Sequence, residues 1–391
     1  MRIVYNAFNG RYADSPRALH RGLLARGVEA EHVWLQDERF VGGFPADVAT
    51  VPIGTRVAVA ALESADVLVS NTHIQLDRWE KPAGAFYLQT WHGTPLKQIH
   101  RAAASIPAEE MMLELDLDIA RWDALVSQSP AATGLLRTAF GYAGPVLETG
   151  YPRNDVLSAP DAAQRRAALR EELGIADEVT AVLYAPTYRD DTVDEADSPD
   201  GLDLEQLVRR LGPGRTVLLR QHYYLYRRPV RTGLVGLVDV SDNPDIADLY
   251  LAADAMVTDY SSAMFDFAVT GKPLLLHPYD LEHYRDQLRG FTFDLDTEGP
   301  GQLVLDPEVL ADRLLALPAT SGADAARYAA FRRRWCGLDD GHATDRVLEA
   351  LLDRILPSTD VQPGPTDGRR RERHQVGAMA RRRRDGSLGG W

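Results

Sequence analysis

Cysteine is almost missing from this chain: Cys336 is the single one among 391 residues. A lone cysteine cannot form an internal disulfide and has no second thiol for a zinc cluster, which fits a reducing compartment. No uninterrupted apolar run reaches the roughly 18 residues of a transmembrane helix. The start, MRIVYNAF, lacks the features of a secretory signal and is typical of a first β-strand. We therefore expect a cytoplasmic location, with any membrane contact being peripheral at the inner face.

Basic residues are scarce relative to acidic ones: 43 Lys and Arg stand against 57 Asp and Glu, a formal charge of −14. Nucleic-acid binding needs clustered cations, so no nucleic-acid partner is expected. The charge is uneven, because Gly368–Trp391 holds eight arginines against Glu372 and Asp385; this segment is +6 and the rest of the chain −20. We predict that 358–391 is a disordered linker and Arg-rich tail. Its charge is either merely solvated or binds a polyanion or the anionic lipid of the cytoplasmic membrane surface.

Several familiar catalytic motifs are also absent. The chain contains no GxxxxGK[ST], HExxH or GxSxG motif and no GxGxxG after the first strand, which removes P-loop, zinc-protease and α/β-hydrolase interpretations. The acidic run 189–200, RDDTVDEADSPD, offers oxygen ligands for a divalent cation, but its Pro and Ser content favours a solvated loop. No protein-built metal site is predicted.

What the chain does have is a βα rhythm that starts twice. Short β-rich runs alternate with helical patterns from RIVYNAF to PVLETG, and again from TAVLYAP to PLLLHPY. A helix is expected to start at Asp14 or Ser15, before Pro16, and to stop at Gly27. The pattern predicts an α/β fold of two facing Rossmann-like domains, 1–160 and 161–357, with closing helices after Asp306. Ligands bind at the carboxyl edges of such sheets, so the site should lie in the interdomain cleft.

The first candidate site is YLQTWHGTPLKQIH, where a strand ends and His92, Gly93 and Thr94 form a turn before a helix whose first turn contains Pro95. Imidazole titrates near neutrality, so His92 could take a proton from an attacking hydroxyl, while Gly93 lets backbone and substrate approach closely. A structural histidine that caps the next helix is the alternative. Spacing alone does not separate the two.

The second candidate is VTDYSSAMFDF, a strand that runs into Thr258 and Asp259 and then into Ser261 and Ser262 at an expected helix N-terminus. Free backbone amides and hydroxyl donors there would suit a diphosphate. Ordinary N-capping by either serine is the alternative. Phosphate binding is favoured because Thr258 and Asp259 add polar groups where one cap would suffice.

Two further strand ends carry positive charge. YAPTYRD delivers Thr187 and Arg189 to the cleft edge, and LLRQH delivers Arg220 and His222. Guanidinium groups match phosphate oxygens, and a protonated histidine would offset charge on a leaving nucleotide. Each arginine taken singly is more often solvated or paired, but four such turns together favour a phosphate site.

The order of these segments is similar to that of a known family. NAFNGRYADSPRAL, WHGTPLK, GYPRND, YAPTYRD, DIADLYLAADAMVTDYSSAMFDF and KPLLLHPYDLEHYRDQLRGFTFD resemble, in this order, the motifs of the CDP-glycerol glycerophosphotransferases, which include teichoic-acid primases and polymerases. The resemblance spans roughly Met1 to Asp296. It implies the GT-B architecture, with the acceptor on the first domain and the CDP-linked donor on the second.

The resemblance also implies roles. His92 would be the base that activates the acceptor hydroxyl, and His222 would bind or neutralise the donor diphosphate. The hydroxyl would attack the β-phosphorus of CDP-glycerol in line and expel CMP. The implied substrate contacts are Gly93, Thr94, Thr187, Arg189, Arg220, Thr258, Asp259, Ser261 and Ser262. Asp259 and Asp266 are either ligand contacts or supports for them.

The implied partners are a CDP-alditol donor and a polyprenyl-linked or polymer acceptor, with no cofactor besides the donor. Two alternatives stay open: a GT-B glycosyltransferase that uses a nucleotide sugar, and a non-catalytic nucleotide- or polymer-binding module. The sequence does not separate a primase from a polymerase or glycerol from ribitol, nor does it fix Mg²⁺ dependence or oligomeric state.

Overall fold

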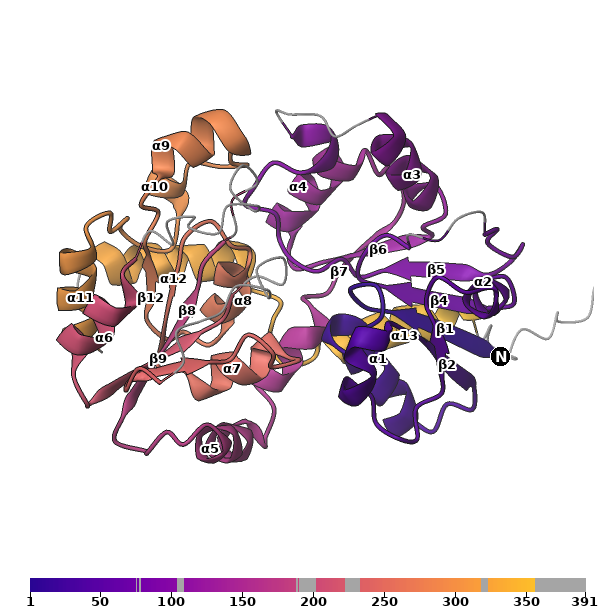
Figure 1. The fold of residues 1–391 in the computed structure, drawn as a ribbon. Coiled ribbons are helices and arrows are strands. Elements are labelled where there is room, and N and C mark those ends of the chain that lie inside the picture. The colour runs from indigo at the N-terminus through magenta and orange to yellow at the C-terminus, as the bar shows by residue number, and fades with distance from the viewer. Residues whose placement is uncertain are drawn as a thin grey trace, which may run out of the picture.

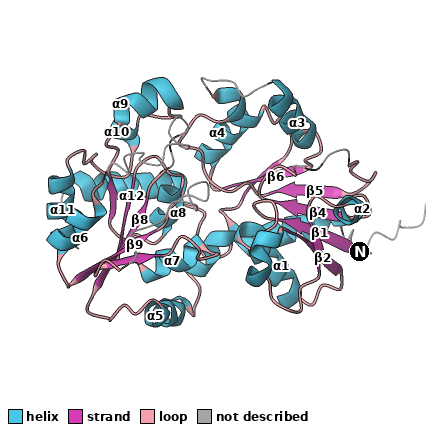
Figure 2. Ribbon diagram, in the orientation of Figure 1, coloured by secondary structure: helices cyan, strands magenta, loops and turns pink. Residues whose placement is uncertain are grey.

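Two parallel sheets, each surrounded by helices, form two lobes (Figures 1 and 2). The computed structural model describes residues 1–74, 76, 79–103, 109–187, 189, 202–221, 233–317 and 323–355. The predicted α/β fold of two Rossmann-like domains is confirmed. The predicted linker and Arg-rich tail, His222 and the acidic run 190–200 lie outside the described residues.

The first sheet has seven parallel strands in the order β3-β2-β1-β4-β5-β6-β7. The strands are β1 (Arg2–Asn6), β2 (Glu31–Gln36), β3 (Thr50–Pro52), β4 (Val67–Ser70), β5 (Phe86–Gln89), β6 (Ala124–Ser127) and β7 (Val146–Glu148). The helices are α1 (Asp14–Ala25), α2 (Arg56–Leu62), α3 (Glu109–Ile119) and α4 (Pro130–Phe140), with 3-10 turns η1 (Glu38–Gly43), η2 (His100–Ala102) and η3 (Pro152–Leu157).

The second sheet has five parallel strands in the order β10-β9-β8-β11-β12. The strands are β8 (Thr180–Ala185), β9 (Arg215–Leu219), β10 (Leu237–Asp239), β11 (Ala255–Thr258) and β12 (Leu274–Leu276). The helices of this lobe are α5 (Ala162–Glu172), α6 (Leu204–Leu211), α7 (Ile246–Ala252), α8 (Ala263–Val269), α9 (Leu281–His283) with a π-helical turn Tyr284–Leu288, α10 (Leu295–Glu298), α11 (Pro307–Leu315) and α12 (Ala323–Trp335). The last described helix is α13 (Ala343–Ile355). The sequence patterns missed β3 and β10, which are three-residue strands at the sheet edges, too short for a clear period of two.

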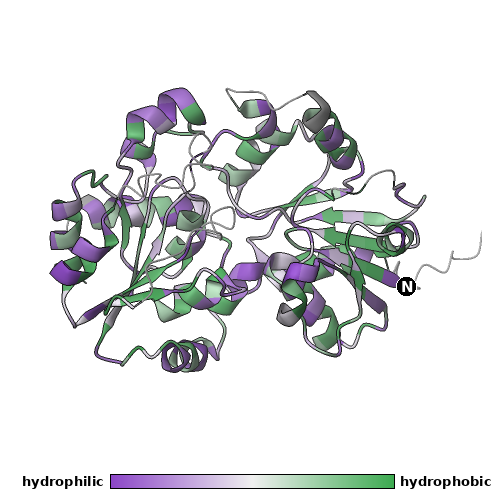
Figure 3. Cartoon of the chain, in the orientation of Figure 1, coloured by the Kyte–Doolittle hydropathy of each residue, from purple (hydrophilic) through white to green (hydrophobic). Residues whose placement is uncertain are grey.

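Alternation along the strands explains why both faces of each sheet are covered. In β1, Ile3 and Tyr5 pack in one apolar cluster and Val4 in another. In β8, Leu183 and Val182 divide between two clusters in the same way. The strands accordingly show hydrophobic colour, whereas peripheral helices such as α5 and α9 show hydrophilic colour (Figure 3). Among the described helices, none combines the length and apolarity needed to cross a membrane.

Helix α1 begins and ends where the sequence predicts, although its N-cap residue is Ala13 and the expected side-chain cap is not formed. It begins at Asp14, whose Oδ1 accepts a hydrogen bond from the Ser15 N–H at 2.6 Å. It ends before Gly27, which has a φ of +66° and so takes a conformation that glycine adopts without strain.

Helix α13 returns to the first lobe, where it appears in yellow beside α1 (Figure 1). Val347, Leu348 and Leu351 are buried with Ile3 and other residues of the first sheet. A Cβ on Gly22 of α1 would lie 2.8 Å from Leu348 Cδ1, so the two helices pack closely. In the domains expected from the sequence, this helix belongs to the second, 161–357. Its apolar face packs on the first, and so the chain crosses between the lobes twice.

Candidate active site

The carboxyl edges of the two sheets meet between the lobes. Strand order reverses at β1 and β4 in the first sheet and at β8 and β11 in the second, and ligands of such sheets bind at these switch points. The segments that follow β5 and β11 carry His92 and Ser262. A Cβ built on Gly93 would lie 2.8 Å from Ser262 Oγ and 3.1 Å from Ser262 Cβ. The structure therefore brings the first two candidate motifs into contact.

His92 is held by a short hydrogen bond. Its Nδ1 lies 2.6 Å from the carbonyl oxygen of Asn71, which follows β4. A carbonyl can only accept, so Nδ1 carries the proton and Nε2 keeps its lone pair. Burial lowers the pKa of His92 to about 4, against a smaller opposing effect of the Asn71 hydrogen bond. The imidazole is therefore neutral at physiological pH and can accept a proton at Nε2.

The backbone around His92 is strained. Trp91, Phe8 and Asn9 have φ values of +51°, +47° and +53°. Such angles are uncommon for bulky residues and concentrate at functional sites. The Phe8 ring lies 5.5 Å from the His92 ring, and the Phe8 N–H donates to Asn71 Oδ1 at 2.8 Å. Asn71 thus fixes both the imidazole and the loop that covers it. No sequence motif singled out Asn71, although its place at the end of a strand could have indicated it.

The segment after Gly93 does not form the expected helix. Residues 93–99 contain no helical turn; β5 ends at Gln89, and the next helical element is η2. Instead, Leu96 O accepts from Thr292 N at 2.8 Å and Gln98 N donates to Gly290 O at 3.2 Å. These backbone hydrogen bonds reach the second lobe, and they outweigh the local preference for a helix that Pro95 suggested. The prediction of a helix here was wrong.

Thr94 lies behind the turn rather than at its surface. It is fully buried, and its Oγ1 donates to Gln128 Oε1 at 2.6 Å. Gln128 in turn donates to Asp339 Oδ2 at 2.8 Å. Burial raises the pKa of the Asp339 carboxyl to about 7. In this arrangement Thr94 supports the turn, and its predicted substrate contact stays a prediction.

The two serines stand at the start of α8. Ser262 is the residue before its first helical position, and Ser261 Oγ accepts from Ala263 N at 3.2 Å. Both serines are partly exposed, whereas Ala263 to Ala268 are buried. The predicted helix start is confirmed. The Ser262 hydroxyl lies against the turn that carries His92, as its contact with Gly93 shows.

Arg189 forms the centre of a buried ion cluster below these serines. Its guanidinium donates to Asp280 at 2.6 and 2.8 Å and to Asp259 at 3.0 Å, and only 7% of the residue is exposed. Asp259 also accepts from the backbone N–H groups of Thr187 and Tyr260, at 2.8 and 2.6 Å. The charge of Arg189 is therefore balanced within the protein. Its position orients the loop before α8.

Thr258 and Arg220 also make internal contacts. Thr258 Oγ1 donates to Ala185 O at 2.7 Å across the sheet. Arg220 Nη1 donates to the carbonyl oxygens of Asn243 and Val240, at 2.7 and 3.2 Å. Both residues stand at strand ends, as predicted. Donor binding by either of them stays a prediction.

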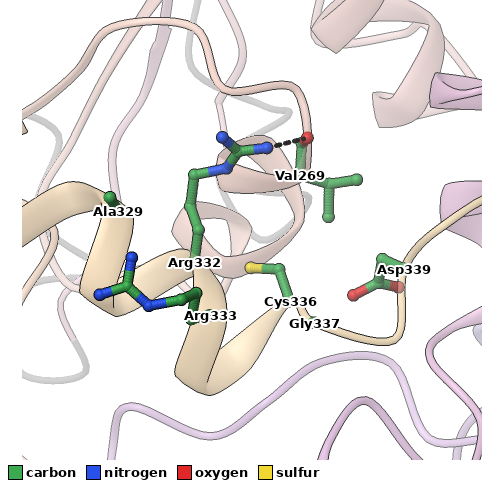
Figure 4. A pocket seen from close by; sticks show the side chains of 7 residues that line it. All are labelled: Val269, Ala329, Arg332, Arg333, Cys336, Gly337 and Asp339. Atoms are coloured by element: carbon green, nitrogen blue, oxygen red, sulfur yellow. Dashed lines mark hydrogen bonds between the residues drawn. The ribbon is translucent and has the colours of Figure 1, made fainter.

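A cavity of about 330 Å³ opens at the C-terminal end of α12 (Figure 4). Val269, Ala329, Arg332, Arg333, Cys336, Gly337 and Asp339 line it. None of these is a predicted site residue. Asp339 connects the cavity to the turn of His92, through Gln128 and Thr94.

Comparison with known proteins gives a consistent result. The sequence profile of a family described as CDP-Glycerol:Poly(glycerophosphate) glycerophosphotransferase matches residues 1–353. A teichoic acid glycerol-phosphate transferase of Staphylococcus aureus is 34% identical over 364 residues, which cover 90% of this chain and 92% of that protein. A teichoic acid poly(glycerol phosphate) polymerase of Bacillus subtilis is 30% identical across 90% of this chain and 48% of the polymerase.

Solved structures agree with this result. The wall teichoic acid polymerase TagF superimposes with a TM-score of 0.82 at 29% identity, over 90% of this chain and 88% of that chain. A TagF variant soaked with CDPG superimposes with a TM-score of 0.81. A UDP-GlcNAc 2-epimerase from Neisseria meningitidis, 13% identical with a TM-score of 0.55, shares the fold alone.

Proposed function

The chain belongs to the CDP-glycerol:poly(glycerophosphate) glycerophosphotransferase family, and from this premise we propose that His92 is the general base of its transfer reaction. The substrates we propose are CDP-glycerol and the terminal hydroxyl of a teichoic-acid-like acceptor, with CMP as the product. The observation that carries this proposal is the fixed tautomer of His92 beside the serines of α8.

The proposed reaction is one in-line displacement. Nε2 of His92 accepts the proton of the acceptor hydroxyl, and the oxygen attacks the β-phosphorus of CDP-glycerol. The bond from that phosphorus to the bridging oxygen breaks, and CMP leaves with the electron pair. Negative charge of the bound diphosphate beside His92 would raise the low pKa of the imidazole and make it a better base. The protein's contribution is then alignment and charge stabilisation.

On the donor side, we propose that Ser261 and Ser262 bind the diphosphate oxygens of CDP-glycerol. Arg189 and Asp259 hold the loop that precedes these serines, and Arg220 and Thr258 stand at neighbouring strand ends. His222, outside the described residues, is kept as the group that neutralises the leaving diphosphate. Peripheral contact with a membrane through the Arg-rich tail would bring the enzyme to a lipid-linked acceptor.

A donor panel tests the proposal. Purified protein is mixed separately with CDP-glycerol, CDP-ribitol and UDP-glucose, each with a short glycerol-phosphate lipid acceptor, and nucleotide release and acceptor mass are measured. We expect CMP release and a glycerol phosphate gain with CDP-glycerol. The His92→Gln protein is the matched control for uncatalysed hydrolysis. Release of UDP with a hexose gain would replace the proposal with a glycosyltransferase, and a ribitol phosphate gain would change the donor.

A further inference from the structure

A buried ion pair joins the two lobes behind the active site. Arg153, in η3, donates two hydrogen bonds from Nη2 to Asp266, at 2.9 and 3.1 Å. Arg153 is 7% exposed and Asp266 5% exposed. The guanidinium also lies over the Tyr151 ring, 4.1 Å from its centroid. The sequence analysis gave no role to Arg153 and left that of Asp266 open.

The pair reaches both halves of the proposed active site. Asp266 lies on α8, one helical turn after Ser262, on the side of the second lobe that faces the first (Figure 1). On the other side, Arg153 Nη1 lies 3.5 Å from Asp14 at the start of α1. Burial is the main influence on Asp266 and raises its pKa, while Arg153 acts in the opposite direction and favours its charged form.

Asn154 extends the same contact to a third segment. Its Nδ2 donates to Asp266 at 2.8 Å and to Asp339 at 3.1 Å. Asp339 accepts from Gln128, which accepts from Thr94, next to Gly93. A continuous set of hydrogen bonds therefore connects α8 to the turn that carries His92.

Stability alone does not explain a charged pair at this position. The desolvation of two buried charges roughly cancels their attraction, and an apolar pair of similar size often stabilises a fold as well. What a planar guanidinium adds is direction, because its Nη2 bonds to Asp266 while its Nη1 lies 3.5 Å from Asp14, so one rigid group relates α8 to the start of α1. The pair lies where the two lobes meet. At this place Gly93 and Ser262 are so close that a Cβ on Gly93 would clash with the Ser262 side chain, so the orientation of α8 matters.

We propose that Arg153 is a positioning residue of the transfer reaction: by holding Asp266 it sets α8, and with it Ser261 and Ser262, at the working distance from His92. The inference rests on the proposed function. A displacement of about 1 Å between base and donor can reduce a rate by roughly 100-fold without removing any group that contacts substrate.

Two conservative variants test this role. Arg153→Lys keeps the charge but has a single nitrogen in place of the two that point to Asp266 and Asp14, and Asp266→Asn keeps the shape but loses the charge. We expect kcat to fall by roughly 10- to 100-fold, with KM for CDP-glycerol changed by less than about threefold, because the donor's own contacts remain.

The matched controls are Arg170→Lys and Asp254→Asn. Arg170 is 2% exposed and pairs with Asp254 at 3.2 Å, but both residues lie in the second lobe. We expect these variants to lower the Tm about as much as the test variants and to leave kcat within about twofold. If kcat of Arg153→Lys and Asp266→Asn falls no further than that of the controls, Arg153 is only structural.

A distance measurement checks the same point without turnover. Spin labels are attached to cysteines placed at Val57 on α2 and Val309 on α11, which are 58% and 45% exposed, while the native Cys336 is 8% exposed. We expect a narrow interdomain distance distribution in the parent and the Arg170→Lys protein and a broader or shifted one in Arg153→Lys. An unchanged distribution in Arg153→Lys would overturn the inference. Failure of the parent to transfer from any donor would instead contradict the proposed function.

Discussion

At the scale of single residues, the hydrogen bond from His92 to the Asn71 carbonyl decides which ring nitrogen can react. Because Nδ1 is the donor, Nε2 is the one nitrogen with a free lone pair. The neighbouring Phe8 and Trp91 adopt strained backbone angles that this arrangement requires. The fold therefore presents a neutral imidazole in a fixed orientation.

The pKa of His92 gives a prediction about pH. The imidazole accepts a proton only in its neutral form, which is present above a pKa of about 4 and is lost as the pH falls through that value. We therefore expect the acid limb of kcat/KM, which reports the free enzyme, to lie well below 6.5, the ordinary pKa of histidine. Rates measured between pH 4 and 8 check this. An acid limb at the ordinary histidine value would show that His92 is less enclosed than the structure indicates.

Substitution of His92 is the companion measurement. His92→Gln should lower kcat by roughly 100- to 10,000-fold, the usual contribution of a general base. His342→Gln is the control, since the side chain of His342 is 70% exposed. Equal activity of the two variants would remove His92 from the reaction.

At the scale of secondary structure, the segment from Pro95 to Gln98 shows how pairing between lobes replaces a local preference. Proline near a turn is typical of a helix start. Here the backbone groups of Leu96 and Gln98 find partners at Thr292 and Gly290 instead. An extended segment satisfies these groups across the interface, which a helix would not do.

Helix α13 provides a test of stability. Leu348 is fully buried against Gly22 and the first sheet, so Leu348→Ala should lower the free energy of unfolding by about 2–5 kcal/mol. Leu24→Ala is the matched control on α1, because Leu24 is 52% exposed and its truncation should cost about 0.5 kcal/mol or less. Urea denaturation followed by circular dichroism compares them. Similar midpoints for the two variants would mean that α13 does not stabilise the first lobe.

At the scale of the whole molecule, two lobes are joined by several separate contacts: the Arg153–Asp266 pair, the backbone bonds of Leu96 and Gln98, and α13. The first two of these contacts involve α8 and the segment that follows His92, which makes the relation between the lobes part of the site. This is why we place the specific role of Arg153 in alignment.

The distribution of charge predicts membrane behaviour for the whole chain. Residues 1–367 carry a net charge of −20 and would be repelled by anionic lipid, whereas eight arginines lie within Gly368–Trp391. Each arginine near an anionic surface contributes about 1 kcal/mol. We expect deletion of 358–391 to reduce sedimentation with phosphatidylserine-containing liposomes. A full-length chain with these arginines changed to glutamine controls for the length of the tail. If the deletion and the glutamine variant both sediment like the parent protein, the tail is not a membrane contact.

The sequence by itself determined the two sheets, the order of the motifs and the residues that stand at strand ends. These features depend on the alternation of apolar and polar residues and on turn residues, which are signals that lie within a few positions of one another in the sequence. His92, Ser261 and Ser262 could be singled out in this way, although their roles in transfer stay predictions.

Only the tertiary structure decided how these residues are used. The pairing of Arg189 with Asp259 and Asp280, the extended course of Leu96 to Gln98 and the return of α13 to the first lobe all depend on residues distant in the sequence. Local pattern cannot encode such contacts, because they form only when segments far apart in the sequence are folded against one another, within a lobe or between the lobes. The alignment of His92 with α8 is decided at the same step.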